Sequence, residues 1–103
     1  MKKTPAYQHS FVGLAWYRPE QWQRLREISQ DRNNLEDTYR EWVRNAEKAI
    51  RELNRNGIQI VKVTLDVEEL LLWCQSQNIP VDDEARSRYV TEKLPGEMQE
   101  SGA

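Results

Sequence analysis

Residues 35–55 carry the longest amphipathic pattern in the chain, and this pattern most constrains the fold. Apolar side chains recur there at steps of three and four residues, which places them on one face of an α-helix. The stripe consists of Leu35, Tyr39, Trp42, Val43, Ala46, Ala49, Ile50 and Leu53. A helix of this length spans about 30 Å, the diameter of a small domain. We therefore expect it to form the spine of the core, with Gly57 in a left-handed C-terminal cap.

Two short apolar segments, residues 10–17 and 58–65, flank this helix and are predicted to be β-strands. The first is rich in aromatic and β-branched residues and ends at Arg18-Pro19. It carries apolar side chains on both faces, which is typical of a buried strand. In the second, valines alternate with Lys62 and Thr64, so one face is expected to be wetter than the other.

Three further helices are predicted, over residues 19–28, 67–77 and 83–94. Pro19 suits the first turn of a helix, where a missing N–H costs nothing. Asp66 suits the N-cap of the helix over 67–77, and Asp82 or Asp83 the N-cap of the last helix. Pro95-Gly96 is expected to end that helix.

The order strand, helix, helix, strand, helix, helix predicts a small α+β domain in which a two-stranded sheet packs on four helices. If each helix reverses the direction of the chain, the second strand runs against the first, which predicts an antiparallel pair. We expect a flexible N-terminal arm over residues 1–9, a single domain over residues 10–94, and a disordered C-terminal tail over residues 95–103.

A two-stranded sheet is marginal by itself, and this favours a homodimer. In a monomer the first strand would be an edge, and an exposed apolar edge invites pairing. Pairing two such edges around a two-fold axis would extend the sheet to four strands, with Val12 and Leu14 near its centre.

Composition argues against several classes of function. Fifteen basic residues oppose seventeen acidic ones, for a net charge of −2, whereas a nucleic-acid binder usually has a basic excess or stripe. The single cysteine, Cys74, precludes an intramolecular disulfide. No apolar stretch approaches the ~20 residues that span a bilayer. We expect a cytoplasmic protein that does not associate with membranes.

No residue pattern indicates catalysis, a cofactor or a metal. His9 is the only histidine and Cys74 the only cysteine, and these two residues match no metal-ligand spacing. The acidic pairs Glu68-Glu69 and Asp82-Asp83 fall in the first turns of predicted helices, where the helix dipole already favours negative charge. We expect no catalytic, cofactor-binding or metal-binding residues and favour a protein that is not an enzyme.

Trp16, Tyr17, Arg18 and Trp22 are the candidate interaction surface. They lie within seven residues at a strand-to-helix junction, and these residue types are enriched in binding hot spots. The alternative is that both tryptophan rings enter the core.

These patterns favour a protein–protein interaction module that self-associates. One alternative is a DNA-binding regulator in which the helices over 67–77 and 83–94 form a degenerate helix-turn-helix. The carboxylates at the start of its second helix would repel phosphates, which argues against this alternative. Another alternative is a small-ligand or enzyme site around Tyr17 and Arg18.

Overall fold

The computed structural model describes the backbone of residues 11–102 and the side chains of residues 11–94; the arm predicted over residues 1–9 lies outside them. The elements are β1 (Phe11–Trp16), the 3₁₀ turn η1 (Pro19–Gln21), α2 (Trp22–Ile28), the 3₁₀ turn η2 (Arg32–Asn34), α3 (Tyr39–Arg55), β2 (Gln59–Thr64), α4 (Val67–Gln77) and α5 (Asp83–Gly102). The prediction of a small α+β fold, with two strands and four helices in this order, is confirmed for the described residues.

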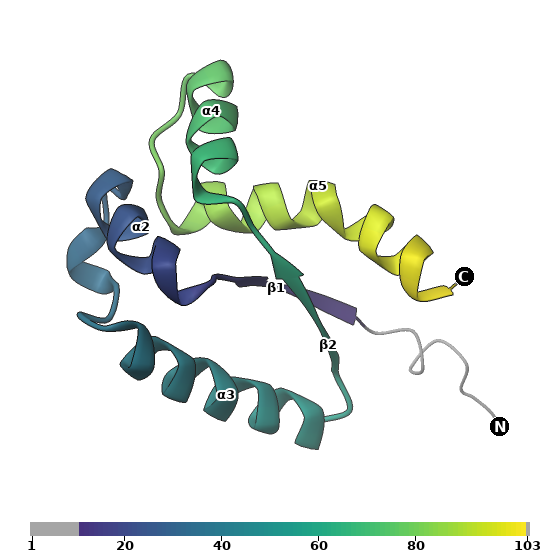
Figure 1. The fold of residues 1–103 in the computed structure, drawn as a ribbon. Coiled ribbons are helices and arrows are strands. Elements are labelled where there is room, and N and C mark those ends of the chain that lie inside the picture. Colours follow the sequence, from purple (N-terminus) through teal and green to yellow (C-terminus); the bar gives the residue numbers. More distant parts are fainter. Residues whose placement is uncertain (1–10, 103) are drawn as a thin grey trace, which may run out of the picture.

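The two strands pair in parallel, so the predicted antiparallel sheet is wrong. That prediction assumed that each helix returns the chain along the sheet. With seven residues, α2 is about 10 Å long, half the length of β1, and it continues away from the end of β1 (Figure 1). The return is made by α3 alone, so the chain crosses over once and β2 starts at the same end as β1.

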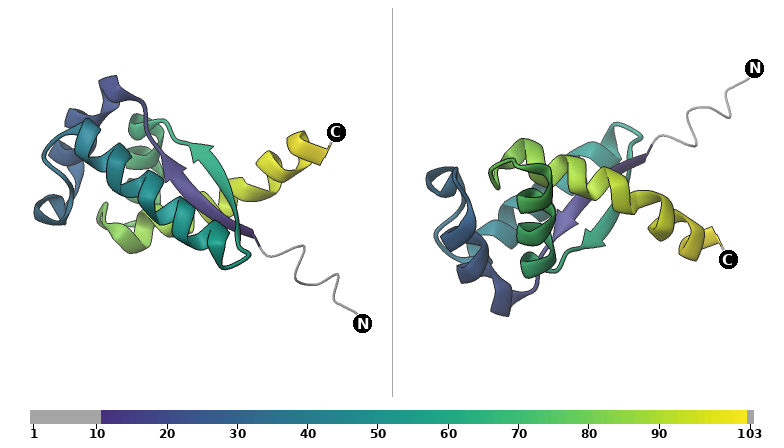
Figure 2. Two further views of the ribbon diagram at one scale, coloured as in Figure 1. Left: turned by 90° about the horizontal axis from the view of Figure 1, so that it is seen from below. Right: turned by 90° about the horizontal axis from the view of Figure 1, so that it is seen from above.

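Helices cover both faces of the sheet. One face is covered by α3, and α4 and α5 lie on the opposite side (Figures 1 and 2). Successive residues of β1 serve the two sides, as expected for a strand that is apolar on both faces. Trp16 packs on Trp42 of α3. Gly13 faces α5 so closely that a Cβ there would lie 2.8 Å from Cγ1 of Val90.

The main core lies on the side of α4 and α5, not along α3 as the sequence predicted. Its buried members are Tyr17, Trp22, Leu25, Val63, Leu65, Val67, Leu70, Cys74, Val81, Ala85, Tyr89 and Val90. The stripe of α3 is only partly buried, because α3 packs over a narrow two-stranded sheet that cannot cover its full width. Trp42 of α3 packs against this same core through the rings of Tyr17 and Trp22, and it also contacts Trp16.

Capping side chains set the ends of α3. Oγ1 of Thr38 accepts a hydrogen bond from the backbone N–H of Glu41 at 3.1 Å, so the helix begins at Tyr39 rather than at Leu35. The predicted left-handed glycine is confirmed, since Gly57 has a φ of +84° just beyond the helix.

The other two long helices begin at the predicted caps, but α5 ends later than expected. Asp66 accepts a hydrogen bond from the N–H of Glu69, and Asp82 accepts one from the N–H of Ala85. Helix α5 continues through Pro95 to Gly102 instead of ending near residue 94. Proline removes one N–H donor, but its fixed φ lies in the helical range, so the backbone continues.

Two leucines of α4 test the position of the core. The side chain of Leu70 is fully buried, whereas Leu72 is 63% exposed. We expect Leu70→Ala to lower the free energy of unfolding by about 2–5 kcal/mol, because it leaves a cavity. The same substitution at Leu72 changes the same helix without a cavity and should stay within about 0.5 kcal/mol of wild type. Urea unfolding of both variants measures the difference. Equal losses in the free energy of unfolding would contradict the placement of Leu70 in the core and Leu72 outside it.

Candidate functional site

The edge of β1 that faces away from β2 carries unpaired backbone groups. Peptide groups alternate between the two edges of a strand, and the C=O of Trp16 accepts a hydrogen bond from the N–H of Leu65 beside β2, at 2.9 Å. Gly13 and Ala15 therefore direct their N–H and C=O groups to the opposite edge. No hydrogen bond from the described residues reaches them there. This edge is a template for another strand.

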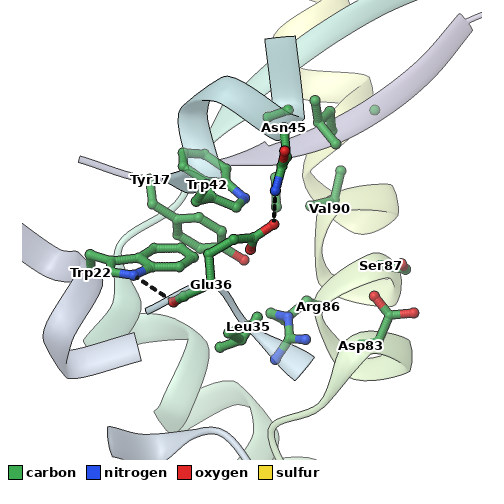
Figure 3. Close-up of a pocket in the computed structure, with 14 residues that line it drawn as sticks. Tyr17, Trp22, Leu35, Glu36, Trp42, Asn45, Asp83, Arg86, Ser87 and Val90 are labelled. Atoms are coloured by element: carbon green, nitrogen blue, oxygen red, sulfur yellow. Dashed lines mark hydrogen bonds between the residues drawn. The ribbon is translucent and has the colours of Figure 1, made fainter. Parts of the chain in front are cut away.

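A pocket of about 340 Å³ lies over this open edge, between α3 and α5 (Figure 3). Gly13, Leu14 and Ala15 of β1 form its floor. One wall comes from Trp42, Asn45 and Ala46 of α3, and the other from Asp83, Arg86, Ser87 and Val90 of α5. Tyr17, Trp22, Leu35 and Glu36 complete its lining. The floor therefore offers backbone hydrogen bonds, while the walls offer side chains.

The aromatic wall of the pocket is held rigidly around Trp42. The ring of Trp22 stacks on it with centroids 5.2 Å apart, and the ring of Tyr17 lies at 5.3 Å. Tyr39 packs on the same tryptophan at 5.5 Å, and its hydroxyl donates to the C=O of Tyr17 at 2.8 Å. Such aromatic pairs add stability beyond their buried area. The rings that line the pocket are thus held in one arrangement.

Two hydrogen bonds fix the position of Glu36 at the pocket. Nε1 of Trp22 donates to its C=O at 3.2 Å, and Nδ2 of Asn45 donates to its Oε2 at 2.8 Å (Figure 3). Its other carboxylate oxygen, Oε1, accepts no hydrogen bond from the described residues. Glu36 therefore presents a positioned, partly unused carboxylate.

A buried ion pair ties α5 to the turn that follows α2. Arg86 donates to both carboxylate oxygens of Asp31, at 3.0 and 2.7 Å, and to Oγ of the buried Ser29 at 3.2 Å. The hydrogen bonds from Arg86 hold the pKa of Asp31 below its ordinary value. Because this guanidinium is already paired with a carboxylate, it adds little net positive charge to the pocket.

The hydroxyl of Tyr17 points into the pocket without a hydrogen-bond partner among the described residues (Figure 3). The residue is only 4% exposed. Burial raises the pKa of this phenol well above its ordinary value; Asp31 and Asp83 add to the effect and Arg86 opposes it. The group therefore stays protonated at physiological pH, as a neutral donor and acceptor.

The structure divides the candidate surface predicted from the sequence. Tyr17 and Trp22 line the pocket. Trp16 lies outside it, under Lys62, whose Nζ is 4.0 Å from the ring centroid. Arg18 is exposed and forms an ion pair with a nearby glutamate. The side chains brought together are thus the two buried ones of the four.

The sequence analysis did not single out Glu36, Asn45 or Arg86 as parts of one site. Asn45 and Glu36 are ordinary surface residue types, and nothing in their spacing indicates a pocket. A signal did exist for Arg86, which stands three and four residues before Tyr89 and Val90. An arginine in the apolar stripe of a helix is expected to be buried only with a partner.

Cys74, outside the pocket, offers no reactive thiol. Cys74 is buried, and burial raises the pKa of its thiol, which keeps it in the less reactive neutral form. Among the described residues there is no group of three His, Cys, Asp or Glu side chains that could hold a metal ion. No helix in that part of the chain is long and apolar enough to span a membrane.

Comparisons of the chain with protein-family models, curated proteins and solved structures give no significant match. The pocket and the open strand edge are therefore the features from which a function can be inferred.

The ion pair between Asp31 and Arg86 makes stability depend on pH in a defined direction. Asp31→Asn leaves a buried guanidinium without its counter-charge, so we expect a loss of about 3 kcal/mol at pH 7. Because folding lowers the pKa of Asp31, its stabilisation is complete above the ordinary carboxyl range, near pH 4, and disappears as the pH falls further. Urea unfolding should show that the difference in free energy of unfolding between wild type and Asp31→Asn is smaller at pH 3 than at pH 7.

Glu68→Gln is the matched control, since Glu68 forms a bidentate pair with Arg24 on the exposed surface. Its removal should change stability little at either pH, because water screens exposed pairs. If the stability difference between wild type and Asp31→Asn is the same at both pH values, the ion pair between Asp31 and Arg86 does not make the predicted contribution.

Proposed function

We propose that this chain is a protein-interaction module that binds an extended segment of a partner along the open edge of β1. The observation that carries the proposal is the coincidence of that edge with the pocket. Gly13 and Ala15 have two N–H and two C=O groups available in the register of a strand. In strand addition such backbone bonds supply affinity, and pockets for alternate side chains supply specificity.

The position of the two helices supports this mode of binding. A two-stranded parallel sheet is too narrow to occupy the space between α3 and α5, and the pocket is the part of that space left beside β1. A third strand would be covered on both faces, as strands of parallel sheets normally are. Its side chains would alternate between the wall of α3 and the wall of α5.

The environment of Arg86 favours this proposal over the helix-turn-helix alternative. Arg86 is one of the basic side chains that the last helix would have to offer to DNA, but it is buried against Asp31. The small-ligand alternative around Tyr17 and Arg18 is also less favoured, because Arg18 lies outside the pocket.

Self-association remains one form of the proposal. In that form the added strand is β1 of a second copy, as expected from the sequence. A partner protein and a second copy differ in whether the chain alone forms an oligomer.

Proline substitution at the strand edges tests the proposal. Ala15→Pro removes an N–H that points away from β2 and places a ring where another strand would pair. Thr64→Pro is the matched control, because the N–H of Thr64 points to the far edge of β2. Binding partners would be selected from a random peptide display library, and oligomeric state measured by sedimentation velocity across a dilution series.

We expect selected peptides to lose affinity by at least about tenfold with Ala15→Pro and to bind Thr64→Pro like wild type. A wild-type dimer that becomes a monomer with Ala15→Pro supports the self-associating form. A monomeric wild type for which the library yields no peptide sensitive to Ala15→Pro overturns the proposal. Circular dichroism of both variants confirms that the fold is intact.

A further inference from the structure

The unpartnered hydroxyl of Tyr17 indicates that the pocket receives a polar group. Tyr17 is 4% exposed, its hydroxyl opens into the pocket without a hydrogen bond from the described residues, and its ring is held in place by Trp42. It lies in the pocket lining, so a group that enters the pocket can supply the missing partner. This observation is independent of the charges that surround it.

The charges in the pocket select the sign of that group. Arg86 and Asp31 neutralise one another. Glu36 and Asp83 also line the pocket, and neither forms an ion pair with a described residue. The lining thus carries two carboxylates outside ion pairs, Glu36 and the exposed Asp83 in the first turn of α5, which together repel an anion and attract a cation.

The remaining surface of the pocket suits a long aliphatic stem. Trp42, Leu35, Ala46 and Val90 contribute apolar surface to the pocket lining. Lysine and arginine side chains pack their methylene stems on such surfaces while their charged ends reach polar groups. A cation beside tryptophan or tyrosine rings gains further attraction from the ring faces.

We propose that the segment added at β1 carries a lysine or arginine whose side chain enters this pocket, with its cationic end at Tyr17 and Glu36. The proposal rests on strand addition at β1 and names the partner's anchoring residue. It assigns Tyr17 as the residue that fixes the head of the incoming side chain and the two carboxylates as the residues that select its charge.

Small probes test the pocket without requiring strand pairing. Pentylamine, pentanol and valerate have the same stem with a cationic, neutral or anionic head. Binding is followed through the indole N–H resonance of Trp22, which donates to Glu36. We expect pentylamine to bind at least about tenfold more tightly than valerate. Equal binding of the two, or no shift with pentylamine, overturns the proposal.

Variants assign the preference to particular side chains. Glu36→Gln combined with Asp83→Asn should abolish the preference for the amine. Asp37→Asn combined with Glu84→Gln is the matched control, because these exposed carboxylates are sequence neighbours that do not line the pocket. The control removes the same charge and should keep the preference. Loss of the preference in both double variants would show a general charge effect and overturn the assignment.

Tyr17→Phe should weaken amine binding severalfold and leave the free energy of unfolding near that of wild type, because the lost hydroxyl has no hydrogen bond in the described structure. Unchanged amine binding with this variant overturns the role of the hydroxyl.

Peptides separate this proposal from the proposed function. We take peptides whose binding is weakened by Ala15→Pro and replace their anchoring lysine or arginine by norleucine. This replacement should lower their affinity about tenfold. If norleucine peptides bind equally well, strand addition holds and the basic anchor is wrong. If amine preference holds but no peptide responds to Ala15→Pro, the pocket selects cations and strand addition is wrong.

Discussion

The parallel pairing of β1 with β2 is the constraint on which the rest of the structure depends. Because α2 is too short to return along the sheet, α3 alone makes the crossover and covers one face. The chain then continues from β2 into α4 and α5 on the opposite face. With only two strands between these layers, the outer edge of β1 is left facing the space between α3 and α5. The candidate site exists because a sheet of only two strands does not fill the space between α3 and α5.

Two rigid contacts set the width of that space. Trp42 fixes α3 against the rings of Tyr17 and Trp22, and the pair between Arg86 and Asp31 fixes the start of α5. A buried ion pair is weak evidence for net stability, because desolvation offsets most of its attraction. Its geometry, however, holds α5 in one position relative to the turn after α2. Both contacts therefore shape the pocket by positioning its walls.

The fold divides the interaction surface predicted from the sequence. Trp16 and Tyr17 both pack on the ring of Trp42, but Tyr17 lines the pocket, whereas Trp16 lies under Lys62 outside it. Arg18 lies beyond the strand, where its charge remains in water. Trp22 reaches the pocket because α2 begins directly after the turn at Pro19. A cluster in the sequence thus becomes two separate surfaces in the fold.

The sequence by itself determined the features that depend on neighbours within about four residues. These are the positions of the strands and most helix starts, the cap at Asp66, the restriction of the last cap to Asp82 or Asp83, and the left-handed Gly57. Only the tertiary structure decided the strand direction and the pairing of Arg86 with Asp31, which are 55 residues apart. The physical reason is the distance along the sequence over which each interaction acts. Hydrogen bonds within one turn are fixed by local spacing, whereas strand direction depends on how far each helix carries the chain before the next strand begins.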